Sequence, residues 1–282
     1  MSKKILIVGL GLIGGSYAMG LTKKGYEVYA IARRQSSIDY AIKNGLIKDG
    51  STSVTKELLQ EFDRIVISLY PKVLLSWIEE YKDFLKEGTI ITDVTGIKCQ
   101  VVYKIQDMLP KGIEFIGAHP MAGKEVYGVE NANDAIFKNA NYIITPTGKN
   151  SLNACDFAKS IGEELEFKNI SVLTPEEHDK MIAFLSQLTH CIAVSLMTCK
   201  DNTHLHEYTG DSFRDLTRIA NINENMWSEL FLMNKEKLVT EMDEFMTEFK
   251  LLRDLIQSED VEGIKEKMKL SSYRRSFFNK KA

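Results

Sequence analysis

The chain has 282 residues, of which 44% are hydrophobic and 27% are charged, a composition that excludes an intrinsically disordered protein. Lys and Arg number 36 against 39 Asp and Glu, a formal net charge of -3, so electrostatics gives no reason to expect nucleic acid or an anionic membrane as partner. The length predicts two domains, and no stretch approaches the run of about 18 apolar residues that a membrane span needs. We therefore expect a cytoplasmic protein without a membrane span, whose partner is a small molecule.

Short aliphatic and β-branched runs recur through the first half of the chain, separated by amphipathic segments of helical period. Each run ends in a small or turn-prone residue, as buried parallel strands do. This alternation predicts an α/β domain over residues 1–171, with a Rossmann-type, doubly wound, mostly parallel sheet covered by helices on both faces. The expected strands are residues 5–8, 27–32, 64–68, 89–93, 115–118 and 142–145, with a last edge strand at 165–170.

A glycine-rich motif, G-x-G-x-x-G, occupies residues 9–14, directly after the first expected strand and ahead of a helical run. In this position the first glycine permits a tight turn, the second lets the backbone approach a pyrophosphate, and the third lets helix and strand pack closely. The helix N-terminus then offers free N–H groups to the phosphates. Without this context the motif would equally fit a plain glycine-rich turn. We predict a dinucleotide site formed by Gly9, Gly11, Leu12, Ile13 and Gly14.

The end of the second expected strand indicates which dinucleotide is preferred. An enzyme that uses NAD places an Asp or Glu there to hold the adenosine ribose hydroxyls, whereas this chain has Ala32. Arg33, Arg34 and Ser36 follow, so cations are available for a 2′-phosphate and no carboxylate repels it. The alternative is that both arginines belong to a solvated turn. We expect NADP as the preferred cofactor, with NAD as the second choice.

From residue 172 to residue 282 the sequence predicts a domain made almost entirely of helices. Thr174-Pro175-Glu176-Glu177 combines a capping residue, a proline at the first helical position and acidic residues in the first turn, which together mark a helix start. The first helix is apolar on more than one face, and we expect the surplus to form a homodimer interface through this domain. Its apolar residues recur at helical spacing: Met181, Phe184, Leu185, Leu188, Ile192 and Leu196.

Two further segments carry side chains suited to chemistry. His119 lies in Gly117-Ala118-His119-Pro120, at the end of an expected strand, where open α/β sheets bind their ligands. A histidine held between a strand and a proline suits proton transfer, although a hydrogen-bonded structural histidine would look the same. Arg218 lies in the helical half, in T-R-I-A at residues 217–220, with M-W following at 226–227. By itself Arg218 could be a surface cation.

Taken together, these segments resemble the prephenate dehydrogenase family. The resemblance rests on H-P-M-A-G-K-E at residues 119–125, on T-R-I-A and on M-W, which occur in the family's order and lie in both halves of the chain. It implies a Rossmann domain followed by a helical dimerisation domain. It also implies an enzyme of tyrosine biosynthesis that converts prephenate to 4-hydroxyphenylpyruvate by oxidative decarboxylation with NAD(P)⁺.

The resemblance assigns roles to individual residues. His119 would be the base that accepts the proton of the substrate's ring hydroxyl while hydride leaves for the nicotinamide. Arg218 would bind the ring carboxylate, a task that suits a guanidinium fork. His190 lies on an apolar helix, where a structural histidine is an equal alternative. The other positions that the resemblance places around the substrate are Glu125, Ser186, His190, Asp215 and Trp227.

One segment departs from the family pattern. The family often has a serine in Asp-Val-Gly-Ser-x-Lys, where its hydroxyl helps to orient the catalytic histidine, whereas this chain reads Asp93-Val94-Thr95-Gly96-Ile97-Lys98. We expect Thr95 to replace that serine from one position earlier and to act as a second catalytic residue. If it does not, water or the cofactor must support His119.

Other functions compete with this interpretation. An arogenate dehydrogenase performs the same chemistry on an amino-bearing substrate, and the sequence hardly separates the two. A β-hydroxyacid or imine-reducing dehydrogenase would need a lysine with a nearby Asn or Asp in the helical half, and no such pair stands beside a pocket motif. A redox sensor that binds NADPH without turnover would need neither His119 nor Arg218. Four residues could suggest a metal site, namely His178, His204, His206 and Glu207. A metal is not expected, because His204 and His206 lack a third ligand at recognisable spacing.

Overall fold

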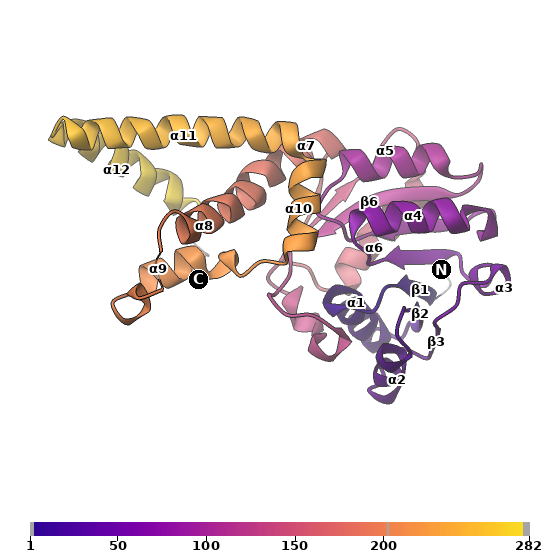
Figure 1. The fold of residues 1–282 in the computed structure, drawn as a ribbon. Helices are drawn as coiled ribbons and strands as arrows, with labels where there is room; N and C mark the ends of the chain where they lie inside the picture. Colours follow the sequence, from indigo (N-terminus) through magenta and orange to yellow (C-terminus); the bar gives the residue numbers. More distant parts are fainter. Residues whose placement is uncertain (1–2, 202, 279–282) are drawn as a thin grey trace. The chain divides into compact units, whose positions relative to one another are not determined.

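The computed structural model describes residues 3–201 and 203–278. The chain divides into two compact units, Met1–Asn234 and Lys235–Ala282, and each is described by itself. The described part of the first unit contains an eight-stranded sheet in the order β3-β2-β1-β4-β5-β6-β7-β8 (Figure 1). Its strands are β1 (Lys4–Val8), β2 (Glu27–Ile31), β3 (Asp49–Ser51), β4 (Arg64–Ile67), β5 (Ile90–Asp93), β6 (Glu114–Pro120), β7 (Asn141–Thr145) and β8 (Asn169–Val172).

The sheet is parallel except where β6 meets β7, which is antiparallel. Helices cover both faces, with α1, α2 and α6 packed on one and α4 and α5 on the other (Figure 1). This arrangement confirms the predicted doubly wound, mostly parallel Rossmann-type fold. The helices around the sheet are α1 (Leu12–Lys23), α2 (Gln35–Lys43), α3 (Lys56–Leu59), α4 (Pro71–Tyr81), α5 (Cys99–Met108) and α6 (Leu152–Glu164), with short helices η1 (Lys82–Phe84), η2 (Val129–Asn131) and η3 (Asp134–Ile136).

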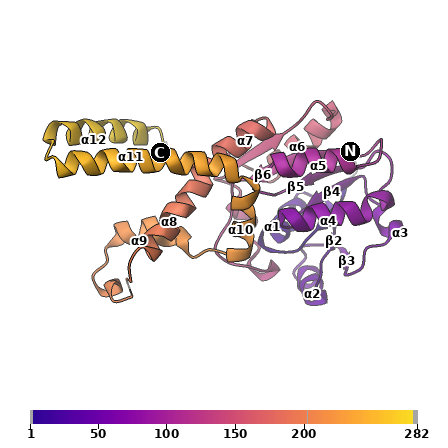
Figure 2. The same cartoon turned by 45° about the horizontal axis from the view of Figure 1, so that its top comes forward.

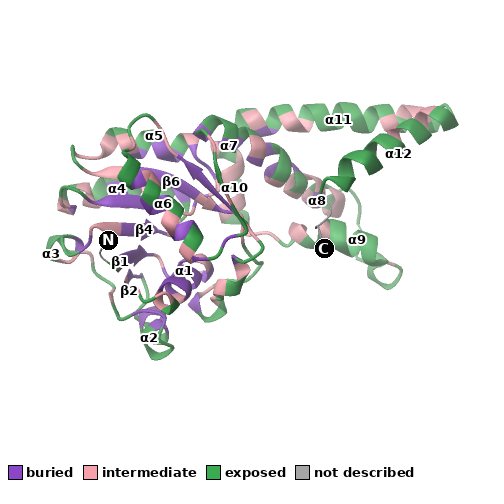
Figure 3. Cartoon of the chain, turned by 180° about the vertical axis from the view of Figure 1, so that it is seen from behind, coloured by how far each residue is buried: buried purple, intermediate pink, exposed green. Residues whose placement is uncertain are grey.

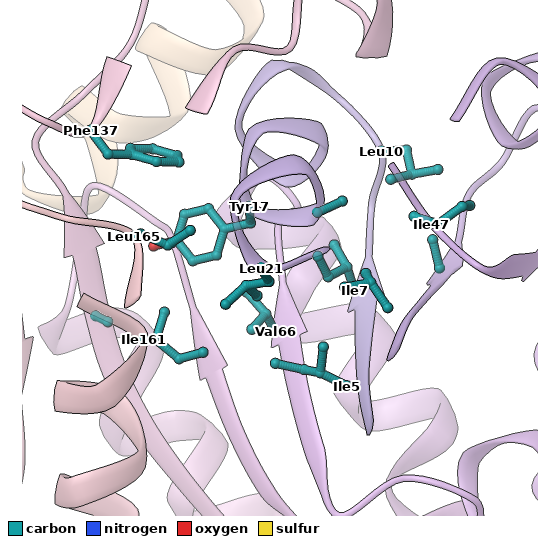
Figure 4. Close-up of a cluster of buried hydrophobic side chains, with 14 of the residues drawn as sticks. Ile5, Ile7, Leu10, Tyr17, Leu21, Ile47, Val66, Phe137, Ile161 and Leu165 are labelled. Atoms are coloured by element: carbon teal, nitrogen blue, oxygen red, sulfur yellow. The ribbon is translucent and has the colours of Figure 1, made fainter. Parts of the chain in front are cut away.

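The strand β1 shows why these runs are nearly all apolar. Successive side chains of a strand point to opposite faces of the sheet, and here both faces are covered. Ile5 and Ile7 belong to the core under α1 and α2, where they lie near Tyr17 of α1 (Figure 4). Leu6 and Val8 belong to the core on the other side. A sheet buried on both faces therefore needs apolar residues at consecutive positions.

The edges of the sheet differ from the prediction. The last strand is Asn169–Val172 rather than residues 165–170, because Leu165 caps α6 and Glu166 has a positive φ of 58°. Leu165 and Phe167 are buried in the core by this turn, so their apolar character reflects packing and not strand pairing. The strand β3 was not expected, because its residues, Asp49–Ser51, are polar and few.

The remainder of the first unit is helical, as expected. The helix α7 begins with a capping box, in which the Thr174 side chain accepts from the Glu177 backbone N–H and the Glu177 side chain accepts from the Thr174 backbone N–H, and Pro175 occupies the first turn. A six-residue π-helix, η4, joins α7 to α8. The elements are α7 (Pro175–Ile182), η4 (Ala183–Leu188), α8 (Thr189–Thr198), η5 (Leu205–Glu207), α9 (Asp211–Thr217), η6 (Arg218–Ala220) and α10 (Glu224–Met233).

The continuous helical stretch Pro175–Thr198 is long and apolar enough to cross a membrane, and no other helix in the described residues is. Core helices of soluble proteins pass the same test, so this finding is weak evidence for a membrane span. Phe184 and Leu185 on this stretch are 54% and 44% exposed. The helix therefore carries more apolar surface than the first unit buries.

The second unit consists of two helices that lie side by side, α11 (Lys235–Gln257) and α12 (Val261–Ser276) (Figure 2). Most of their surface is exposed, in contrast to the buried strands of the sheet (Figure 3). Large apolar side chains contribute to this surface, among them Phe249, Ile256 and Met268, which are 65%, 59% and 61% exposed. These helices need a partner surface to cover such side chains.

Candidate active site

The glycine-rich loop between β1 and α1 has the geometry of a dinucleotide site. Gly9 has a φ of +100°, and a Cβ there would stand 2.3 Å from the Ser68 carbonyl oxygen. A Cβ on Gly14 would stand 1.9 Å from the Gly9 carbonyl oxygen. Both positions therefore exclude any side chain. A Cβ on Gly11, in contrast, would meet nothing within 4 Å, so the chain leaves the space beside Gly11 open.

The start of α1 adds the second feature that a pyrophosphate needs. Gly11 is the N-cap residue of this helix, and no side chain caps it. Leu12 and Ile13 form the first turn, and the N–H groups of a first helical turn have no partners within the helix. The residues present thus fit a dinucleotide, with the phosphates over Gly11 and the end of α1.

The end of β2 presents cations and no carboxylate. Ala32 is buried and its N–H donates to the Ser51 carbonyl oxygen at 3.1 Å. Arg33, Arg34 and Ser36 are exposed, and their side chains have no hydrogen-bond or ion-pair partner within residues 3–201 and 203–278. The two guanidinium groups are therefore available to a ligand.

The carboxylate of Asp93 organises the end of β5. Its Oδ2 accepts from the Lys98 ammonium at 2.7 Å and from the Thr95 N–H at 2.9 Å, and it is also bonded to the Thr95 hydroxyl. Its Oδ1 accepts from the Ala118 N–H at 2.9 Å. Burial lowers the pKa of Lys98, and the nearby Asp93 opposes that shift. This buried ion pair fixes the backbone immediately before His119.

The expectation that Thr95 orients His119 directly is wrong. The Thr95 hydroxyl contacts Asp93, the Ile97 carbonyl oxygen at 3.0 Å and the Lys98 ammonium at 3.2 Å. The hydroxyl is buried among these partners. They use both its donor and its acceptor capacity, and none of them is the imidazole of His119. The Thr95 hydroxyl is therefore connected to the segment of His119 through Asp93, which accepts from the Ala118 N–H.

His119 is instead bonded to a second histidine that sequence reasoning did not assign to the site. The Nδ1 of His119, near the end of β6, lies 2.9 Å from the Nε2 of His178 on α7. The Nδ1 of His178 lies 2.7 Å from the Asp179 Oδ1. The Asp179 carboxylate also accepts from the backbone N–H groups of Lys98 and Cys99, each at 2.8 Å, at the start of α5. Three elements thus meet behind the imidazole of His119.

The protonation of this chain follows from burial. Burial, the neighbouring His178 and the Lys98 ammonium hold the pKa of His119 well below its ordinary value. Burial also lowers the pKa of His178, although Asp179 partly offsets that effect. The pKa of Asp179 is raised by burial but falls below its ordinary value on balance, because His178 and the backbone N–H groups stabilise the carboxylate. At neutral pH both imidazoles are neutral and Asp179 is ionised.

A second cluster gathers four of the residues predicted to bind the substrate. Arg218 on η6 forms an ion pair through Nη1 with Glu125 in the loop after β6. The ring of His190 on α8 stacks on Trp227 of α10 at a centroid distance of 3.7 Å. Burial lowers the pKa of His190, Arg218 lowers it further, and Glu125 opposes the shift, so the ion pair and the stacked rings lie close enough to interact.

Ser186 and Asp215 behave differently from these four. The carbonyl oxygen of Ser186, within the π-helix η4, accepts from the His190 Nδ1 at 2.8 Å and fixes that ring. A π-helical turn often occurs at functional positions of helices. Asp215 is exposed on α9, and its side chain makes no hydrogen bond or ion pair with any described residue. The structure therefore does not bring Asp215 into the cluster.

The described residues include no group of three or more His, Cys, Asp or Glu side chains that could hold a metal ion. His178 was considered from the sequence only as a metal ligand. Its place next to Asp179 in a capped helix start is the one signal that could have marked it, since an adjacent His-Asp pair is also typical of buried hydrogen-bond chains. The buried pair of Asp93 and Lys98 was quoted only for its departure from a family motif.

Comparisons with known proteins agree with this geometry. The family model for the prephenate dehydrogenase nucleotide-binding domain matches residues 17–171, and that for its dimerization domain matches residues 174–270. A prephenate dehydrogenase from Bacillus subtilis is 32% identical over 276 residues, which cover 94% of this chain and 73% of the relative.

Two solved structures extend the likeness to the fold. The prephenate dehydrogenase of A. aeolicus, in complex with hydroxyphenyl propionate and NAD⁺, has a TM-score of 0.89 and 29% identity, with 98% of each chain covered. The arogenate dehydrogenase of Synechocystis has a TM-score of 0.84 and 25% identity, covering 98% of this chain and 100% of that chain. Because both family domains match in order and over most of the chain, this protein belongs to the prephenate dehydrogenase family.

Proposed function

We propose that this chain is an NAD(P)-dependent prephenate dehydrogenase of tyrosine biosynthesis, which oxidises and decarboxylates prephenate to 4-hydroxyphenylpyruvate. The observation that carries the proposal is the position of the His119 imidazole, held at the end of β6 by its 2.9 Å contact with His178, and burial keeps its pKa well below the ordinary value. A neutral imidazole at the ligand-binding edge of a Rossmann sheet is suited to accept a proton. Membership of the family supports the substrate.

The reaction needs a proton acceptor and alignment. A dinucleotide held by the glycine loop of Gly9, Gly11 and Gly14 would supply the hydride acceptor for the ring carbon that bears the hydroxyl. His119 takes the hydroxyl proton through Nε2 as that oxygen becomes the phenolic oxygen of the product. The bond from the ring to its carboxylate breaks, carbon dioxide leaves, and the electron pair completes the aromatic ring. The proton held by His119 then returns to the phenolate oxygen, which gives the phenol of the product and restores the neutral imidazole. Because aromatisation drives this step, the protein chiefly supplies alignment and the base.

Arg218 is proposed to bind the ring carboxylate of prephenate. The Nη1 of the Arg218 guanidinium donates to Glu125. The other N–H groups of that guanidinium remain for a bidentate contact with the substrate carboxylate. The stacked pair of His190 and Trp227 would line the same pocket. Ser186 and Asp215 remain proposed pocket residues, Ser186 through its bond to His190, and Thr95 supports the base through Asp93.

Purified protein should be offered prephenate and arogenate, each with NAD⁺ and with NADP⁺, while formation of reduced cofactor is followed by absorbance. We expect turnover of prephenate, faster with NADP⁺. Turnover of arogenate alone would make the chain an arogenate dehydrogenase. This alternative is considered because the similar Synechocystis structure is that of an arogenate dehydrogenase. Cofactor binding without turnover of either substrate would favour the NADPH sensor.

We also propose that NADP is preferred over NAD, because Arg33 and Arg34 lie beside Ala32 without partners in the described chain. The variant Ala32→Asp should shift the ratio of kcat/KM for NADP to that for NAD by about tenfold or more toward NAD, since an Asp repels the 2′-phosphate and holds the ribose hydroxyls. The variant Ala32→Asn, equal in size and uncharged, is the control. A ratio that Ala32→Asp leaves unchanged would contradict the proposed preference.

The assembly and domain division are proposed on the same basis. Residues 1–171 would form the dinucleotide-binding domain and residues 172–282 the substrate-binding and dimerisation domain. Each unit has exposed apolar side chains that a homodimer would cover, those of η4 in the first unit and those of α11 and α12 in the second. The family model for the dimerization domain supports this assembly, and a soluble biosynthetic dimer would lie in the cytoplasm.

A further inference from the structure

Two fully buried residues, His178 and Asp179, stand behind His119 and take no part in the mechanism proposed above. Their side chains are 0% and 1% exposed, so neither of them reaches a substrate. Both lie on α7, and α7 is tied to α5 by the two backbone N–H groups that Asp179 accepts. An Asn234 side chain also donates to the Asp179 carbonyl oxygen at 2.8 Å. The pair is therefore held rigidly with respect to the active histidine.

The direction of each hydrogen bond in this chain can be assigned from Asp179. An ionised carboxylate only accepts, and that of Asp179 already receives two backbone N–H groups. The 2.7 Å contact between its Oδ1 and the His178 Nδ1 therefore requires a proton on that nitrogen. Since a neutral imidazole carries one proton, the His178 Nε2 has a lone pair and accepts.

The same step fixes the proton of His119. Its Nδ1 lies 2.9 Å from the His178 Nε2, so the shared proton must belong to His119 Nδ1. A neutral His119 then has an unprotonated Nε2. That nitrogen lies toward the Gly96 backbone, 3.6 Å from the position that a Cβ on Gly96 would take. The absence of a side chain at Gly96 keeps the space beside this nitrogen open.

We propose that His178 and Asp179 are positioning residues, which lock His119 in the tautomer whose Nε2 is a proton acceptor. The inference rests on the proposed function, in which His119 is the base. It resembles the way an aspartate orients a catalytic histidine in a hydrolytic triad, with one additional imidazole inserted between carboxylate and base.

The neighbouring groups set the resting protonation of His119 and His178. His119 faces His178 and Lys98, and His178 faces Asp179, Lys98 and the carboxylate of Asp93. The carboxylates of Asp179 and Asp93 act on His178, whereas burial, His178 and Lys98 all lower the pKa of His119. Burial is the main reason why the pKa of each resting imidazole is lowered, and the Lys98 ammonium lowers both further.

The tautomer of His119 can be measured without any substitution or substrate. Two-bond ¹H–¹⁵N correlation spectra of the full-length protein distinguish protonated from unprotonated ring nitrogens, and the chain has only five histidines to assign. We expect protonated Nδ1 and unprotonated Nε2 for both His119 and His178 at neutral pH. A His119 ring protonated at Nε2 would overturn the inference. Because this readout needs no turnover, it stands apart from the substrate assay that tests the proposed function.

Variants of His178 test whether the lock matters for the reaction. In His178→Leu the acceptor is lost, and we expect His119 to populate both tautomers and kcat to fall roughly tenfold or more. KM for prephenate and affinity for NADP should stay unchanged. In His178→Gln the amide oxygen can accept from His119 Nδ1, so the tautomer and most of kcat should be recovered. The exposed His204, changed to Gln, is the matched control.

The outcomes separate positioning from mere packing. A structural role would lower the activity of His178→Gln as much as that of His178→Leu and would leave the tautomer of His119 unchanged, and either result overturns the inference. If His178→Leu fails to fold, the wild-type tautomer and the Gln variant still decide. If the wild-type chain oxidised neither prephenate nor arogenate, the proposed function would fail while the tautomer measurement kept its meaning.

Discussion

Replacing His119 with Asn should lower kcat by about 10² to 10⁴ while leaving NADP affinity unaltered, the range expected when a general base is removed. Asn keeps a donor at the position of Nδ1, so the bond to His178 survives, but it has no nitrogen that can accept a proton at the position of Nε2. The glycine loop that fits the cofactor belongs to β1 and α1, which the substitution leaves alone. Steady-state kinetics with prephenate and fluorescence titration with NADPH would measure both quantities.

The pH dependence of the wild-type enzyme gives an independent check. The pKa of His119 is held well below its ordinary value, chiefly by burial, so the base stays unprotonated as pH falls through neutrality. We expect kcat/KM to stay level down to below about pH 6.5, the ordinary value for histidine, and to fall only as pH passes through the lowered pKa. In His119→Asn the fall of kcat/KM at low pH should be absent. Turnover equal to that of the wild type would remove His119 as the base.

The alternation of short apolar runs with segments of helical period was enough to predict the fold, because the sheet is buried on both faces. Ile5 and Leu6 are consecutive and apolar, and the structure places them in separate cores on opposite sides of β1. Local chemistry likewise predicted the start of α7, since the capping interaction of Thr174 with Glu177 depends on residues three positions apart. Signals of this kind are contained within a few residues.

Where the prediction failed, contacts between distant segments decide the structure. Residues 165–167 look like a strand, yet Leu165 and Phe167 are apolar because they fill the core below α6. Thr95 was expected to bond His119, and the buried Asp93 takes its hydroxyl instead. The partner of His119 is His178, which is 59 positions away. No spacing rule connects β6 with α7 before the chain is folded.

The candidate substrate site was predictable in part for the same reason. Motif resemblance nominated Glu125, Arg218, His190 and Trp227, and the structure joins them by an ion pair, a ring stack and mutual electrostatic influence. Asp215 was nominated by the same motif, but it is exposed and makes no hydrogen bond or ion pair with the members of that cluster in the described chain. Proximity in sequence to Arg218 does not fix the side of the helix on which a residue lies.

Replacing Arg218 with Ala should raise KM for prephenate by about 10- to 100-fold with a smaller change in kcat. A hydrogen bond to a charged group contributes about 1.5–3 kcal/mol, which corresponds to that range after allowance for solvent, because the Arg218 side chain is 64% exposed. KM of Arg218→Lys should lie between those of the wild type and Arg218→Ala, since an ammonium keeps the charge but lacks the planar fork. Initial rates over a range of prephenate concentrations at saturating NADP⁺ give both constants.

The matched control is Arg214→Ala, four positions earlier on α9, where the guanidinium pairs with Asp211 and is similarly exposed. Removing that cation changes the net charge by the same amount, so any general loss of attraction for an anionic substrate appears in both variants. The effect specific to Arg218 is the difference between them. An unaltered KM in Arg218→Ala, or an equal rise in Arg214→Ala, would contradict the carboxylate contact. In that case the ion pair with Glu125 serves only to hold η6 against the loop after β6.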